Sequence, residues 1–271
     1  MEFVKLTESE FAKFAQFIHD IAGIYLKETK ITLLSNRLRK RLKEKNFETF
    51  EEYYNYIKNS QDQIEINEML NAVSTNETYF FRNAKHYDAL IDKIVPELIS
   101  KRRTPIKIWS AGCSSGEEAF TLCMLLDEKG YLDRTKVEIY GSDINTGVLE
   151  EAKRGIFDDK RLRTTPEKYK NRYFKHLGDD LYELEKKIVN FVKFERINLK
   201  RDKFNDFYDV IFCRNVMIYF EKEDQQKIVE KFYNALNKDG YFIIGHSESL
   251  YFISNSFKYM KISDAPIYYK E

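Results

Sequence analysis

Apolar positions in the first 73 residues recur with the period of an α-helix. In "TESEFAKFAQFIHDIAGI" the apolar residues fall on one face, and Thr7 and Glu10 have the spacing of a capping box. Residues 31–45 repeat the pattern, and two shorter helical segments follow, "TFEEYYNYIK" and "QIEINEMLNAV". The pattern predicts a small domain of four short helices over residues 1–73.

From residue 84 onward, predicted strands alternate with predicted helices. The helical segments are "HYDALIDKIVPELISKR", "EEAFTLCMLLDEKG", "TGVLEEAKRGIF" and "EKEDQQKIVEKFYNALNKDG". The strand segments are "IKIWSAG", "KVEIYGSD", "YDVIFCRN" and "GYFIIGHS". This alternation is typical of an α/β domain with a mainly parallel sheet, which we expect over residues 84–271.

Two segments do not fit the alternation. Residues 160–195 are polar, charged and partly strand-like, and we interpret them as an insertion. Residues 74–83, "STNETYFFRN", join the two domains and combine three consecutive aromatic residues with Asn, Thr and Arg. A simple linker does not need the aromatic residues, and a core helix does not need the polar ones. The segment therefore has a further role.

The composition narrows the class of protein. The 271 residues are 43% hydrophobic, which is enough for a folded core, and the net charge of +1 gives no argument for binding nucleic acid or acidic membranes. No apolar run approaches about 18 residues, so we expect no direct membrane insertion. Cys113, Cys123 and Cys213 lie in apolar segments, which is typical of reduced core thiols in a cytoplasmic protein and not of a metal site.

The ends of three predicted strands carry candidate binding residues. Ligands of such sheets bind at the carboxyl ends of the strands. After the first strand, a glycine turn leads to Glu117, whose carboxylate would repel a pyrophosphate but attract a cationic or hydroxyl-bearing ligand. Asp143 ends the next strand and can accept both hydroxyls of a ribose. Arg214 and Asn215 follow the third, where the amide suits a nucleobase or an amino-acid group.

Each of these features also has a purely structural interpretation. A glycine between strand and helix serves turn geometry, and an acid at a strand end often caps the next helix. The pattern G-x-G-x-x-G is absent, and Asp143 lies 31 residues after Gly112 where a dinucleotide fold expects about 20. The combination favours a nucleoside without a pyrophosphate, and S-adenosylmethionine is such a molecule.

Six motifs together resemble the chemoreceptor glutamate methyltransferases of the CheR type. They are "STNETYFFR", "IWSAGCSSGEEAFTL", "GSDINTGVLEEAKRGIF", "VKFERINL", "DVIFCRNVMIYF" and "GYFIIGHSESL", and they span nearly the whole chain. The resemblance implies a Rossmann-like methyltransferase sheet with a small helical N-terminal domain and a small inserted antiparallel β-subdomain. It also implies transfer of a methyl group from S-adenosylmethionine to glutamate side chains of bacterial chemoreceptors.

The resemblance implies roles for individual residues, with residues 74–83 folded over the cofactor. The implied cofactor contacts are Asn76, Thr78, Arg82, Glu117, Asp143, Asn198, Leu199, Arg214 and Asn215. Arg82 and Tyr219 are our candidates for aiming the acceptor carboxylate. That carboxylate is ionised near neutral pH, so no general base is required, and His246 is the only histidine that we place near the site.

The partners implied by the resemblance are the cytoplasmic helices of receptors, and we expect a cytoplasmic monomer. Residues 30–45 are strongly basic, and we select Arg37, Lys40 and Arg41 for receptor docking, although a solvated helix face is the alternative interpretation. Some members of the family grip a receptor's C-terminal pentapeptide with the inserted subdomain. Here a tight turn with Asp179 and Asp180 replaces a longer glycine-bearing turn, so we expect no such binding.

Two other classes of function remain open from the residues alone. One is a methyltransferase acting on nucleic acid or a small molecule. The chain lacks N-P-P-Y-type and P-C motifs, and its charge lacks a phosphate-binding pattern. The other is a non-catalytic sensor that binds S-adenosylmethionine in the same pocket.

Overall fold

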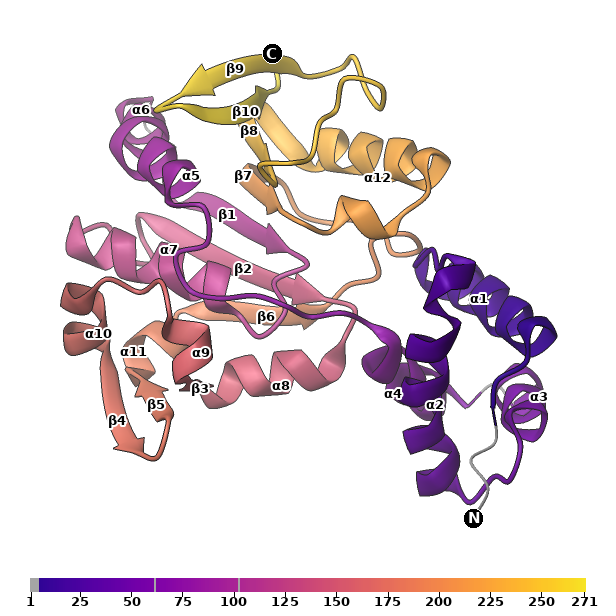
Figure 1. Cartoon of the computed structure of the whole chain (residues 1–271). Coiled ribbons are helices and arrows are strands. Elements are labelled where there is room, and N and C mark those ends of the chain that lie inside the picture. The colour runs from indigo at the N-terminus through magenta and orange to yellow at the C-terminus, as the bar shows by residue number, and fades with distance from the viewer. Residues whose placement is uncertain (1–4, 61, 102) are drawn as a thin grey trace.

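The computed structural model describes residues 5–60, 62–101 and 103–271 (Figure 1). The helical part consists of α1 (Glu8–Ala22), the 3-10 turn η1 (Glu28–Lys30), α2 (Ile31–Lys45), α3 (Phe50–Ser60) and α4 (Gln63–Val73). The predicted capping box is confirmed, because Thr7 Oγ1 accepts from the Glu10 backbone N–H at 3.2 Å and the Glu10 carboxylate accepts from the Thr7 N–H at 2.8 Å. Phe14 is fully buried in the core of this domain, where its ring stacks on Tyr53.

A buried ion pair also lies inside the helical domain. The carboxylate of Glu65 is fully buried and receives hydrogen bonds from Arg41 Nε at 3.0 Å, Arg41 Nη2 at 2.6 Å and the Tyr53 hydroxyl at 2.7 Å. Burial alone would raise the pKa of Glu65, but the bonds from Arg41 and Tyr53 outweigh it and lower the pKa. Arg41 therefore faces the domain interior, and our assignment of Arg41 to receptor docking is wrong. Lys40 is exposed.

The larger domain contains a seven-stranded sheet in the order β6-β2-β1-β7-β8-β10-β9. Its strands are β1 (Ile106–Ala111), β2 (Val137–Asp143), β6 (Val192–Arg196), β7 (Tyr208–Cys213), β8 (Leu236–Ile244), β9 (Lys258–Ile262) and β10 (Ala265–Tyr269). The first five strands in this order are parallel, and the β9–β10 hairpin pairs antiparallel to β8. The mainly parallel sheet is as predicted, whereas the sequence analysis did not foresee the terminal hairpin.

Helices cover both faces of the sheet. The helical elements are α5 (Ala84–Ala89), the π-helix η2 (Leu90–Ile94), α6 (Val95–Ser100), α7 (Glu117–Glu128), α8 (Thr146–Arg154), the 3-10 turn η3 (Met217–Tyr219) and α12 (Lys222–Ala235). Alternate residues of the strands enter two cores: Ile108 and Phe212 pack with helices α5 to α7, whereas Trp109 and Ile211 pack with α12. The register pairs Ala111 with Ser142, so the carboxyl ends of these strands meet at one edge.

A three-stranded antiparallel sheet in the order β3-β5-β4 forms the predicted subdomain. Its elements are β3 (Ile156–Asp158), α9 (Asp159–Leu162), α10 (Glu167–Tyr173), β4 (Phe174–Gly178), β5 (Leu181–Leu184) and α11 (Lys186–Val189). The limits of the insertion differ from the predicted 160–195. The small sheet begins at Ile156, and residues 192–196 belong to the main sheet, where they pair with β2.

The helical domain is docked against the carboxyl edge of the main sheet (Figure 1). Carbonyl groups at the C-terminal end of α1 accept hydrogen bonds from side chains of residues 198–201. The pairs are Asn198 Nδ2 to the Ile21 carbonyl at 2.6 Å, Lys200 Nζ to that of His19 at 2.9 Å, and Arg201 Nη2 to that of Asp20 at 2.9 Å. A second contact joins α4 of the helical domain to the larger domain. The Asn71 side chain near the end of α4 accepts a hydrogen bond at 2.9 Å from the backbone N–H of Thr146, the first residue of α8.

The ion pair of Arg41 yields a stability prediction. Arg41→Ala leaves the buried Glu65 carboxylate without its main cation, and we expect a loss of about 3–5 kcal/mol in the free energy of unfolding. Lys40→Ala, on the exposed side of the same helix, is the matched control and is expected to change it by less than about 0.5 kcal/mol. Denaturant unfolding checks both values. Equal midpoints for the two variants would show that the Arg41–Glu65 pair contributes nothing.

Candidate functional site

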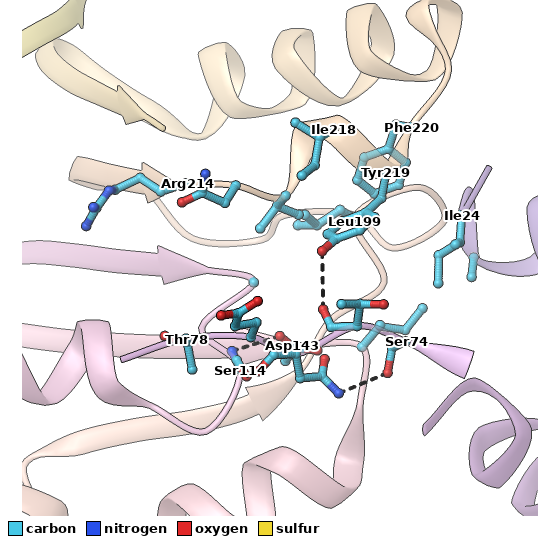
Figure 2. Close-up of a pocket in the computed structure, with 18 of the residues that line it drawn as sticks. Ile24, Ser74, Thr78, Ser114, Asp143, Leu199, Arg214, Ile218, Tyr219 and Phe220 are labelled. Atoms are coloured by element: carbon cyan, nitrogen blue, oxygen red, sulfur yellow. Dashed lines mark hydrogen bonds between the residues drawn. The ribbon is translucent and has the colours of Figure 1, made fainter. Parts of the chain in front are cut away.

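A cavity of about 590 Å³ lies between the two domains, at the carboxyl edge of the sheet. It is lined by the segment after α1, by residues 73–79 and by the ends of β1, β2 and β7. In Figure 2, Arg214, Ile218, Tyr219, Phe220 and Leu199 lie on one side, Thr78, Ser114, Asp143 and Ser74 lie opposite, and Ile24 of the helical domain lies at one end. The volume is within the usual range of small-molecule sites.

The aromatic residues of "STNETYFFRN" hold this segment in place. The Phe80 ring is fully buried and packs edge-on against Phe157 and Phe174, at centroid distances of 4.9 and 5.1 Å. Phe81 packs against Tyr169, and its backbone N–H donates to Thr121 Oγ1 at 3.2 Å. This anchoring leaves the polar residues of the segment, Asn76, Thr78 and Arg82, along the cavity wall.

Asp143 lies at the end of β2, nearly buried, in the cavity wall. Its Oδ2 accepts the Ser114 backbone N–H and its Oδ1 that of Asn145, both at 2.9 Å. Burial raises the pKa of Asp143, and these two N–H groups act against the rise. Since a carboxylate has about four lone-pair sites, two remain for a ligand's hydroxyl groups. Gly112, beside it, has a φ of +76°, and a Cβ there would lie 2.4 Å from Val216 Cγ2, so a side chain is excluded.

Arg214 and Asn215 follow β7 and have different surroundings. The Arg214 guanidinium donates to Glu118 Oε2 at 3.0 Å, to the Tyr87 hydroxyl at 3.1 Å and to the carbonyl of Arg82. Through these bonds Arg214 links the end of β7 to α5, α7 and the 74–83 segment, which together form this part of the cavity wall. Asn215 has a left-handed backbone conformation with a φ of 60°, and its Oδ1 is buried without a hydrogen-bond partner among the described residues. It is the acceptor that a ligand's ammonium or amide group would satisfy.

Arg82 and Tyr219 both line the cavity. Arg82 Nη1 donates to the Glu77 carbonyl at 3.2 Å, and the Tyr219 hydroxyl donates to the Thr75 carbonyl at 3.4 Å. Burial raises the pKa of Tyr219, while the positive charges of Arg82 and Arg37 act in the opposite direction. The phenol is therefore protonated near neutral pH and can donate a hydrogen bond to an anion.

Three residues that we placed at or near the site lie elsewhere. Glu117 is fully buried outside the cavity lining, where its carboxylate pairs with Arg161 Nη1 at 2.8 Å. Burial raises the pKa of Glu117, and the charge of Arg161 opposes the rise. The side chain of Asn198 is used in the bond to the α1 carbonyl, away from the lining. His246 is exposed and does not line the cavity.

The sequence analysis missed other residues of the cavity wall. Glu118, and not Glu117, lines the cavity. Two adjacent acids at the start of a helix point about 100° apart, so only one can face the ligand, and the pattern "GEE" does not tell which. Arg37, which we had assigned to receptor docking, also lines the cavity, and it donates from Nη2 to Thr75 Oγ1 at 3.1 Å.

The residues present fit S-adenosylmethionine. Asp143 would hold the ribose hydroxyls, the apolar side chains of Ile197 and Leu199 would contact the adenine, and Asn215 Oδ1 would accept from the ammonium group. Asp143, which has no cationic partner among the residues described, supplies negative charge for a cationic ligand, whereas Arg214 balances the charge of Glu118. Within the part of the chain that the structure describes, no cluster of side chains could hold a metal ion, and no helix has the length and apolar character to cross a membrane.

Asp143 yields a binding prediction. Asp143→Asn removes a charged acceptor from the ribose, and we expect it to weaken S-adenosylmethionine binding by roughly 1.5–3 kcal/mol, or about 10- to 100-fold in Kd. Asp158→Asn is the control, because Asp158 also accepts a backbone N–H, that of Arg161, but lies outside the cavity lining. Calorimetry that found the same affinity for both variants would remove Asp143 from the binding site.

Comparisons with known proteins identify the family of this chain. Residues 76–265 match the family model "CheR methyltransferase, SAM binding domain", and residues 9–74 match "CheR methyltransferase, all-alpha domain". The chain is 40% identical to the chemotaxis protein methyltransferase of Borreliella burgdorferi, over 91% of this chain and 90% of that protein. It is 33% identical to chemotaxis protein methyltransferase 2 of Vibrio cholerae, over 100% and 96%. The chain therefore belongs to the CheR family of chemotaxis methyltransferases, and its cofactor is S-adenosylmethionine.

Proposed function

We propose that this protein methylates glutamate side chains on the cytoplasmic helices of bacterial chemoreceptors, giving 5-O-methyl esters that adapt chemotactic signalling. The observation that carries the proposal is the set of side chains that line the cavity. Groups suited to the cofactor lie in the same space as Arg82 and Tyr219, and no histidine is among the described residues that line it. A glutamate acceptor needs no general base, because its carboxyl group has an ordinary pKa of about 4.3.

The role of the chain in this reaction is to position the acceptor. When bound, the cofactor would supply a methyl group on a cationic sulfur; the carboxylate oxygen would form the new C–O bond as the C–S bond breaks, which would leave neutral S-adenosylhomocysteine. Arg82 spends one of its five N–H donors on the Glu77 carbonyl and has others to steer the carboxylate. The Tyr219 hydroxyl can replace its long 3.4 Å bond to Thr75 with one to the acceptor. Too tight a pair would stabilise the ground state, so we assign both residues a steering role.

The proposal predicts base-labile labelling of receptors. Wild-type protein incubated with methyl-labelled S-adenosylmethionine and receptor-bearing membranes should transfer label that mild base releases. Arg82→Ala should reduce the turnover rate about 100-fold, since misplacement of a reacting group by about 1 Å has that effect. Its thermal stability should stay near that of the wild type.

Arg163→Ala is the matched control for Arg82. The Arg163 guanidinium stacks 3.7 Å from the centre of the Tyr79 ring, over which Arg82 also lies, but Arg163 is outside the cavity lining. Label on nucleic acid or a small molecule would favour the other class of methyltransferase, and cofactor binding without any transfer would favour the sensor. Equal rates for the two arginine variants would remove Arg82 from the reaction.

We further propose that exposed lysines at the cavity mouth and on α2 attract the acidic surface of the receptor. Lys30 lines the mouth and Lys40 projects from α2, so the double variant Lys30→Glu, Lys40→Glu should raise the KM for receptor several-fold. Lys40→Glu alone, at a position outside the cavity lining, should raise this KM less and leave the affinity for S-adenosylmethionine unchanged. The effect should shrink at about 1 M salt, where the screening length is about 3 Å.

The control for this charge reversal places the same change at the opposite edge of the sheet. Lys136 and Lys238 are exposed near the amino ends of β2 and β8. If Lys136→Glu, Lys238→Glu raised the KM equally, net charge and not a local patch would govern docking.

The small sheet is proposed to form no site for a receptor's C-terminal pentapeptide. β4 and β5 are joined by the two residues Asp179 and Asp180, where Asp179 has a φ of 46°. The tight turn leaves little room beside the strands, and its two acids would repel an acidic peptide. Fluorescence anisotropy with a labelled pentapeptide should show no binding up to high micromolar concentration. A Kd in the low micromolar range would contradict this proposal and leave the methyltransferase reaction unaffected.

A further inference from the structure

The motif "GHSESL" after β8 contains a partly buried glutamate, Glu248, to which the sequence analysis gave no role. Glu248 Oε2 accepts the backbone N–H of Asn215 at 2.8 Å and that of Gly245 at 2.6 Å. Burial raises the pKa of Glu248, and the backbone N–H groups of Asn215, Gly245, Ile218 and Met217 act against the rise. One side chain thus faces three N–H groups of the turn that follows β7, those of Asn215, Met217 and Ile218.

This turn carries two functional side chains. Asn215 is held in the left-handed conformation between β7 and η3, and η3 ends at Tyr219, whose side chain projects into the cavity (Figure 2). Backbone N–H groups at such a turn have no partner within a helix or a strand, and a buried one without a partner is costly. Glu248 supplies that partner from 33 residues away, so the position of the turn depends on it.

The packing around the carboxylate leaves no spare room. A Cβ on Gly245 would lie 2.5 Å from Glu248 Oε2 and 3.0 Å from Asn215 Nδ2. The φ of Gly245 is outside the left-handed range, so an alanine there would displace the neighbouring side chains but would not strain the backbone. Asn215 Oδ1 and Glu248 Oε1 are both buried without a hydrogen-bond partner among the described residues.

We propose that Glu248 is a positioning residue for methyl transfer, which holds the Asn215 amide toward the cofactor and the η3 turn at the height that Tyr219 requires. Glu248 does not line the cavity, so it acts through Asn215 and Tyr219 and not by contact with the ligand. Its effect on cofactor binding rests on the proposed contact between Asn215 and S-adenosylmethionine, whereas its effect on turnover rests in addition on the proposed function.

Four variants of the full-length chain test this role. Glu248→Ala releases the turn and should raise the Kd for S-adenosylmethionine at least about tenfold, the equivalent of one charged hydrogen bond, and should lower kcat as well. Glu248→Gln should restore both values to within about threefold, because the amide oxygen can accept the same two N–H groups. Gly245→Ala keeps the carboxylate but displaces it, and should resemble Glu248→Ala.

The fourth variant, Asp209→Ala, controls for stability. Asp209 is a buried carboxylate at the opposite end of β7 and accepts the Lys107 N–H at 2.9 Å. Asp209→Ala should lower the melting temperature without changing the Kd for S-adenosylmethionine. The proposal is overturned if Glu248→Ala and Gly245→Ala lower the melting temperature as Asp209→Ala does while Kd and kcat stay at wild-type values. If the alanine variant does not fold, Gly245→Ala and Glu248→Gln decide the question by the same Kd comparison.

The two proposals fail in different ways. A wild-type protein that binds S-adenosylmethionine but methylates no receptor would contradict the proposed function. The calorimetric comparison of the Glu248 variants would still be valid, because it requires no acceptor.

Discussion

The site depends on hydrogen bonds that the carbonyl groups at the C-terminal end of α1 accept from the other domain. The last carbonyl groups of a helix have no partner within it. Here the Gly23 N–H donates to the His19 carbonyl, and side chains of the other domain, Asn198, Lys200 and Arg201, donate to the carbonyls of Ile21, His19 and Asp20. Cationic side chains at this end also suit the helix dipole. The same contacts bring the segment after α1 to the carboxyl edge of the sheet, where the Tyr25 N–H donates to the Tyr219 carbonyl at 2.8 Å. The cavity is the space that this docking encloses.

The segment 74–83 closes the cavity with two kinds of residue, aromatic side chains that anchor it and polar side chains that line the cavity. Phe80 and Phe81 are buried against the inserted subdomain, so that subdomain serves the site as packing for the linker. The polar residues on either side of them, Asn76, Thr78 and Arg82, line the cavity. Methyl transfer to the proposed glutamate acceptor would need orientation more than acid–base chemistry, and we propose that the anchored linker and the Glu248-bound turn supply that orientation.

The sequence predicted the features that local pattern determines. The helical period gave the N-terminal helices, and the alternation of strands and helices gave the parallel sheet, together with Asp143 and Asn215 at its edge. The errors concern side chains whose partners are distant in sequence. Arg41 pairs with Glu65, 24 residues away, and Glu117 pairs with Arg161, 44 residues away. Asn198 bonds to a carbonyl 177 residues away, and no local pattern reveals such a partner.

The central claim is that both domains enclose one cofactor site, and amide hydrogen exchange of the wild-type chain with and without S-adenosylhomocysteine tests it most directly. The account predicts slower exchange in peptides from residues 20–37 and 73–82 of the helical domain and linker. It predicts the same in peptides from residues 112–116 and 214–219 at the strand ends. Protection confined to residues 84–271 would contradict it, because the helical domain would then take no part in holding the cofactor.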